Sequence, residues 1–120
     1  MKVARWIASL LAVLVAGSVS AHAFLDHAEP PVGGVVHAAP ARVEVWFSED
    51  LEPAFSTLKV INAADKQVDR MDKSVPGGDR SRMSVSLNAA LPPGKYRVRW
   101  RAVSVDTHVT QGDFTFEIAP

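Results

Sequence analysis

The sequence predicts an all-β protein, an antiparallel sandwich built from short strands. Apolar and polar residues alternate in one run after another, and this period of two is typical of half-buried strands. No run has the period of 3.6 that would indicate a helix longer than a turn or two. The runs are separated by turns rich in proline and glycine, namely PPVGG (30–34), AAPA (38–41), PGGD (76–79) and LPPG (91–94).

The first 21 residues, MKVARWIASLLAVLVAGSVSA, have the three parts of a secretory signal peptide. Lys2 and Arg5 form a basic start, an apolar run of 11 residues follows from Trp6, and the segment ends in small residues. An apolar run of this length is well short of the roughly 20 residues that a membrane anchor needs. We therefore expect residues 1–21 to be removed and the rest of the chain to be exported.

The composition of residues 22–120 limits what the exported protein can do. These 99 residues are enough for one domain with a single core. They include 11 basic and 13 acidic residues, so the net charge is −2 with neutral histidines, which gives no reason to expect a nucleic acid partner. There is no cysteine, which excludes disulfides, zinc fingers, blue-copper sites and thiol nucleophiles. Any metal must bind to nitrogen and oxygen, or to methionine sulfur.

Four runs carry the alternation most clearly. Trp46 falls on the polar side of the run RVEVWFS, so we expect that face to be partly covered. Residues 62–80 are the most polar and least patterned part, and we expect them to form a hairpin or loop on the surface. The apolar positions expected to face the core are Val43, Val45 and Phe47, Leu58 and Val60, Met83, Val85 and Leu87, and Phe114, Phe116 and Ile118.

The segment LPPGKYRVRW (91–100) carries a more specific signal. A Pro-Gly turn followed by Tyr96 and an alternating strand resembles the tyrosine corner of immunoglobulin-like sandwiches. In that motif the tyrosine hydroxyl bonds back to the backbone. Ordinary core packing of Tyr96 is an equally good interpretation of the same pattern.

His22 is the first candidate metal ligand. If the leader is cut after Ala21, His22 becomes the N-terminal residue and offers both its α-amine and its imidazole to one metal. This chelate suits Cu(II), which prefers nitrogen and oxygen ligands in a tetragonal arrangement. The amine, with a reference pKa of about 8, loses its proton readily when a metal competes. A cut after Ala23 fits the signal-peptide pattern slightly better and would remove the histidine.

The second candidate is the pair Asp106 and His108 in VDTHVT (105–110), after the strand that begins at Tyr96. In extended chain both side chains project from the same face, because they are two residues apart. Together with His22 they would complete a set of three nitrogens and one oxygen around a divalent ion. The alternative, which spacing alone favours, is an Asx-type turn in which Asp106 caps the backbone of a hairpin loop.

With these residues in view, the chain after the leader resembles the CopC/PcoC family of periplasmic copper-binding (copper resistance) proteins. Four segments carry the resemblance: HAFLDHAEPPVGG, AAPARVEVWFSEDLEP, LPPGKYRVRWRAVSVDTH and GDFTFEI. The resemblance implies an immunoglobulin-like Greek-key β-sandwich of about seven strands over residues 22–120. It also implies that the protein resides in the periplasm.

The resemblance further implies how copper is bound. Carried over by matching position, the Cu(II) ligands would be the amine and imidazole of His22, with Asp106 and His108. Glu49, in FSEDL, matches a family glutamate close to the copper and could hydrogen-bond a ligand or a copper-bound water. A solvated carboxylate at the end of a strand is the alternative for Glu49.

Some members of the family have a second, Cu(I) site in a methionine-rich loop. After the leader this chain contains only Met71 and Met83, and Met83 falls on the apolar side of its strand, where core packing is expected. We therefore expect Cu(II) binding without a methionine-rich Cu(I) site. His27 has no place in the ligand set and could either approach the metal or face solvent, while His37 is expected on the surface.

The resulting hypothesis is a copper-binding protein that is not an enzyme. It would sequester Cu(II) for copper homeostasis or resistance, or pass it to a membrane partner, and the resemblance implies an inner-membrane copper importer of the CopD type. We expect a monomer. One alternative is a copper oxidase or monooxygenase built on the N-terminal histidine, although a domain of 99 residues leaves little room for a substrate platform. Another is a metal-independent sandwich used in adhesion or assembly.

Overall fold

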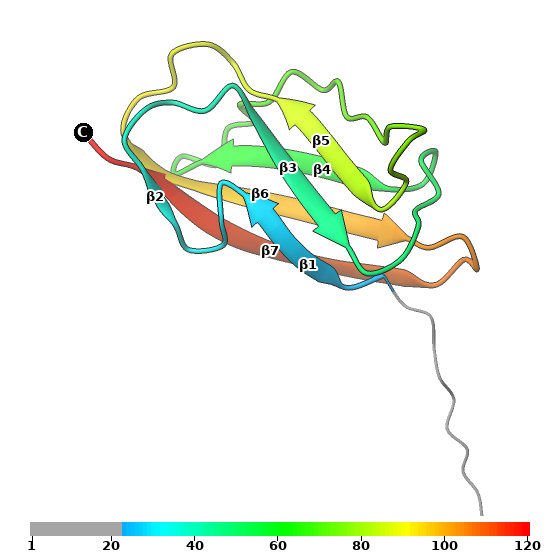
Figure 1. The fold of residues 1–120 in the computed structure, drawn as a ribbon. Helices are drawn as coiled ribbons and strands as arrows, with labels where there is room; N and C mark the ends of the chain where they lie inside the picture. Colours follow the sequence, from blue (N-terminus) through cyan, green and yellow to red (C-terminus); the bar gives the residue numbers. More distant parts are fainter. Residues whose placement is uncertain (1–22) are drawn as a thin grey trace, which may run out of the picture.

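A computed structural model describes residues 23–120, which fold as two β-sheets packed face to face (Figure 1). The predicted all-β sandwich is confirmed. The predicted signal peptide and His22 lie outside the described residues. No helix among residues 23–120 is long and apolar enough to cross a membrane. The strands are β1 (Leu25–Glu29), β2 (Val35–Val36), β3 (Arg42–Phe47), β4 (Thr57–Asn62), β5 (Arg82–Ser86), β6 (Gly94–Val103) and β7 (Val109–Ile118).

One sheet has the strand order β1-β3-β5 and the other has the order β2-β7-β6-β4. All neighbouring strands are antiparallel except the short β2, which runs parallel to the end of β7. The longest ladder joins β6 to β7, where the residues from Gly94 to Val103 pair with those from Ile118 to Val109. Residues 104–108 close this hairpin at one end of the sandwich (Figure 1).

The core lies between the sheets and contains the apolar positions that the alternation predicts. All eleven are buried, and Met83 is completely buried, which confirms its expected place in the core. Trp46 is half-buried on the opposite face of β3, where the ring of His27 stacks on it with centroids 4.4 Å apart. The expected cover over this polar face is therefore provided by β1.

Tyr96 forms a tyrosine corner and also packs in the core, so both interpretations of the segment 91–100 are confirmed. Its hydroxyl donates a hydrogen bond to the carbonyl of Pro92 at 2.6 Å, as in a tyrosine corner. Its buried ring stacks on Phe116 with centroids 5.5 Å apart. Burial raises the pKa of the Tyr96 phenol because the ionised form would be poorly solvated.

The polar segment 62–80 is a loop with isolated bridges to β4 and β5, but it is not all surface. Val68 and Asp69 are buried, so the expectation of a surface loop is wrong for these two residues. The carboxylate of Asp69 accepts hydrogen bonds from the backbone N–H groups of Val60 and Met71, at 2.8 and 2.9 Å. These partners compensate the loss of water around a buried charge.

The tyrosine corner yields a stability prediction. In Tyr96→Phe the ring and its stacking remain, while the hydrogen bond to Pro92 is lost. We expect the free energy of unfolding to fall by about 1 kcal/mol, the usual net contribution of one hydrogen bond. Urea denaturation of both proteins measures the difference. Equal stability would show that the hydroxyl contributes nothing to the corner.

Candidate metal centre

The loop 104–108 is fixed by Ser104, a residue that is 1% exposed. Its backbone N–H donates to the carbonyl of His108 at 3.0 Å, and its own carbonyl accepts from the N–H of Thr107 at 2.8 Å. Thr107 has a φ of 69°, a left-handed conformation that a β-branched residue rarely adopts and that costs about 1–3 kcal/mol. Strained backbone of this kind is concentrated at functional sites.

Asp106 and His108 face each other across this turn. Oδ2 of Asp106 lies 3.1 Å from Nδ1 of His108, with the two side chains 41% and 49% exposed. The expectation that both project from extended chain is wrong, because the residues lie in a turn and not in a strand. The turn nevertheless brings the predicted carboxylate and imidazole into contact.

The environment of Asp106 favours its ionised form. The hydroxyl of Ser104 donates to Oδ1 of Asp106 and is the main cause that holds the pKa of this carboxyl below its usual value. Desolvation, the second-largest effect, raises the pKa, while the imidazole, the charge and the backbone N–H of His108 lower it further. The backbone contribution is the capping that the Asx-turn interpretation expects. Asp106 therefore caps the backbone of the loop and also contacts the imidazole of His108.

The N-terminal arm is attached at the same end of the sandwich. Ala23 is fully buried, and its carbonyl accepts a hydrogen bond from the hydroxyl of Thr110, two residues after His108. The N–H of Phe24 donates to the hydroxyl of Ser48 at 2.9 Å, and the N–H of Ser48 donates back to the carbonyl of Phe24 at 2.9 Å. Residues 23 and 24 are thus held between β7 and the end of β3.

Glu49 lies between one residue that bonds to the N-terminal arm (residues 23 and 24) and another that bonds to the 104–108 loop. Its neighbour Ser48 bonds to Phe24, while the carbonyl of its other neighbour, Asp50, accepts from the N–H of Val105 at 3.2 Å. Glu49 is partly buried. The structure therefore places the arm, Glu49, and the loop with Asp106 and His108 at one end of the molecule.

The described residues supply only part of a metal site. Within residues 23–120, no group of three or more histidine, aspartate and glutamate side chains is arranged to hold a metal ion. Asp106 and His108 provide one oxygen and one nitrogen, which suit a divalent metal such as copper. The third predicted ligand, His22, is outside the described range.

The other two histidines lie elsewhere. His27 points to the outer face of the three-stranded sheet, where its Nδ1 is 2.7 Å from Oδ2 of Asp26 and its side chain is 58% exposed. His37 is exposed, as expected, and follows β2, which pairs with the end of β7 farthest from the 104–108 loop.

Sequence reasoning missed Ser104 and Thr110. Each is a hydroxyl residue within an ordinary strand pattern, so nothing in the sequence distinguishes it from a solvated neighbour. Their importance follows from what they contact: Ser104 holds the carboxylate of Asp106, and Thr110 holds the carbonyl of Ala23.

Comparison with known proteins identifies relatives over most of the chain. Protein YobA of Escherichia coli K12 is 37% identical over 112 residues, which cover 93% of this chain and 90% of the relative. Copper resistance protein C of Pseudomonas syringae pv. tomato is 36% identical over 111 residues, covering 88% of this chain and 87% of the relative.

The fold has a close counterpart among solved structures. The crystal structure of CopC from Methylosinus trichosporium OB3b superposes with a TM-score of 0.76 at 27% identity, covering 82% of this chain and 95% of that one. A family model for the CopC domain matches residues 25–119, nearly the whole described chain. Both sheets, the tyrosine corner and the 104–108 loop lie within this range. The chain belongs to the CopC family.

Proposed function

We propose that this protein binds Cu(II) in the periplasm, for copper homeostasis or resistance, and acts as a binding protein and not as an enzyme. The observation that carries the proposal is the contact between Asp106 and His108 in a strained, firmly held loop. Kinship with a copper resistance protein supports the choice of metal. The partial exposure of both side chains leaves room for an ion to approach.

The proposed ligands are the α-amine and imidazole of His22, the carboxylate of Asp106 and the imidazole of His108. The anchoring of Ala23 supports this set, because it holds the residue that follows His22 in the sequence at the end of the sandwich where Asp106 and His108 lie. Three nitrogens and one oxygen match the tetragonal preference of Cu(II). The carboxylate also offsets part of the positive charge of the ion.

Glu49 is proposed to support the site by hydrogen-bonding a ligand or a copper-bound water. Its position between two residues that contact the arm and the loop supports this role. Sulfur is absent from the proposed set, which favours Cu(II) over Cu(I). Of the two methionines in the described range, Met83 is packed in the core and Met71 is 75% exposed on the 62–80 segment.

The same family relationship supports a proposal for the destination of the metal. We propose that a monomer either sequesters Cu(II) or passes it to an inner-membrane importer of the CopD type. A site at one end of the molecule, with its ligands on a loop and on the N-terminal arm, suits transfer because a partner can approach it without opening the sandwich.

Replacing a proposed ligand gives the first test of the function. His108→Ala removes one of the four donor atoms, so its effect should exceed the roughly 10–100-fold loss of affinity that follows removal of a supporting group. Competition titrations with a Cu(II) chelator measure the affinity. His37→Ala is the matched control and should bind as the parent does. Unchanged affinity in His108→Ala would contradict the ligand assignment.

Ser104 provides a second test, on the positioning of the carboxylate. In Ser104→Ala we expect Cu(II) affinity to fall by about 10–100-fold, while Ser104→Thr, which keeps the hydroxyl, restores most of it. The pKa of Asp106 in the copper-free protein should rise towards its ordinary value, because the lost hydrogen bond favoured the ionised form. An NMR pH titration of the Asp106 carboxyl measures this shift. A folded Ser104→Ala protein with parental affinity would show that the hydroxyl does not position the ligand.

A further inference from the structure

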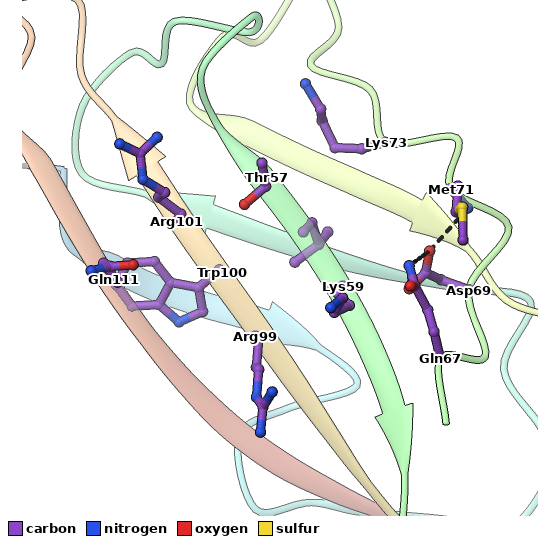
Figure 2. Close-up of a pocket in the computed structure, with 11 residues that line it drawn as sticks. Thr57, Lys59, Gln67, Asp69, Met71, Lys73, Arg99, Trp100, Arg101 and Gln111 are labelled. Carbon is purple, nitrogen blue, oxygen red and sulfur yellow. Dashed lines mark hydrogen bonds between the residues drawn. The ribbon is translucent and has the colours of Figure 1, made fainter. Parts of the chain in front are cut away.

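A second feature lies on the four-stranded sheet, outside the metal centre. A hollow of about 500 Å³ is bounded by side chains of β4 and β6 and by the segment 67–73 (Figure 2). Its lining includes four cationic side chains, which come from three different parts of the chain. We call it the basic hollow and define it by Lys59, Lys73, Arg99 and Arg101.

The positive charge of the basic hollow is not neutralised within residues 23–120. None of its four cations forms an ion pair in this range. Lys73 and Arg101 donate only to the carbonyls of Pro53 and Phe55. The single carboxylate in the lining, Asp69, is occupied by two backbone N–H groups and by Gln67.

This concentration of charge carries a cost in stability. Lys59 and Arg99 are directly opposite each other on β4 and β6, and like charges in that position repel. Arg101, two residues after Arg99 on β6, lies on the same outer face of the sheet. Asp113 lies directly opposite Arg99 on β7, but its carboxylate forms its ion pair with Arg97, at 2.8 Å, and none with Arg99. Since the exported chain is slightly acidic overall, the patch does not follow from its net charge. An anion from outside would relieve the repulsion.

The lining also shows what kind of anion fits. Among the apolar side chains at the hollow, only Met71 is exposed: Leu58 is buried, and the ring of Trp100 packs against Phe47 on the core side of the sheet. Arg99 and Arg101 are two residues apart on a strand, about 7 Å, which is also the spacing of alternate side chains in an extended peptide. The four cations line a hollow in the surface, which a single extended chain can enter more readily than a planar layer of lipid headgroups.

We propose that the basic hollow is a docking surface for an acidic segment of a partner protein, an extended chain with carboxylates at alternate positions. The hollow adjoins the metal centre, because Arg101 and Gln111 pair near the end of the β6–β7 hairpin whose loop contains Asp106 and His108. A docked partner would lie next to that end. Docking itself needs no copper.

The test uses the copper-free exported protein and a synthetic 12-residue peptide with glutamate at alternate positions and serine between them. Isothermal titration at low salt measures the dissociation constant. In Lys59→Glu/Arg99→Glu we expect binding to weaken at least about tenfold. Lys66→Glu/Lys95→Glu is the matched control: it makes the same change in net charge at two exposed residues outside the hollow, and it should bind within about threefold of the parent.

Three results would overturn the proposal. The first is a parent protein that does not bind the peptide. The second is an equal loss of binding in the two double variants, which would show attraction by net charge alone. The third is a parent protein that binds phosphatidylglycerol vesicles but does not bind the peptide, which would make the surface a lipid site. Thermal unfolding of Lys59→Glu checks the premise: its melting temperature should rise, because an opposite charge then faces Arg99. A fall in a folded variant would show that no repulsion exists to be relieved.

Discussion

The hydrogen bonds of Ser104 fix the end of the molecule on which the proposed function depends. A buried hydroxyl and a buried backbone N–H must find partners, and in Ser104 they find the carboxylate of Asp106 and the carbonyl of His108. These bonds keep Thr107 in a conformation that it would otherwise avoid. The loop is therefore set by the buried end of β6 and not by its own exposed side chains. The same strand end also forms a bridge with Leu51, two residues after Glu49.

Strands β3 to β7 could be predicted because their residues alternate with a period of two, and burial of one face follows directly from that period. β1 and the two-residue β2 show no such alternation. Asp106 and His108 became candidates through the resemblance to the CopC/PcoC family, and the structure brings their side chains into contact. Their geometry could not be predicted. The left-handed Thr107 turns the pair out of the extended chain, and residues 104–108 contain no glycine or asparagine that would indicate such a turn.

Asp69 shows the other limit of prediction. A charged residue in the most polar stretch of the chain indicates a surface position, yet the structure buries it. Its backbone donors come from Val60 on β4 and from Met71, and only the folded chain places the first of them beside the carboxylate. The basic hollow was hidden for the same reason: its lysines and arginines are spread over 59–101, and their repulsion appears only when β4 and β6 pair. Pairing of distant segments, and not local pattern, creates both features.

The central claim is that the N-terminal histidine completes the copper site, and the exported protein itself tests it. Native mass spectrometry of protein recovered from the periplasm of copper-supplemented cells gives the first residue and the bound metal in one measurement. The account predicts a mass that corresponds to residues 22–120 with one copper ion. A chain that begins at Phe24 and carries no copper would contradict it, because only Asp106 and His108 would then remain of the proposed ligands.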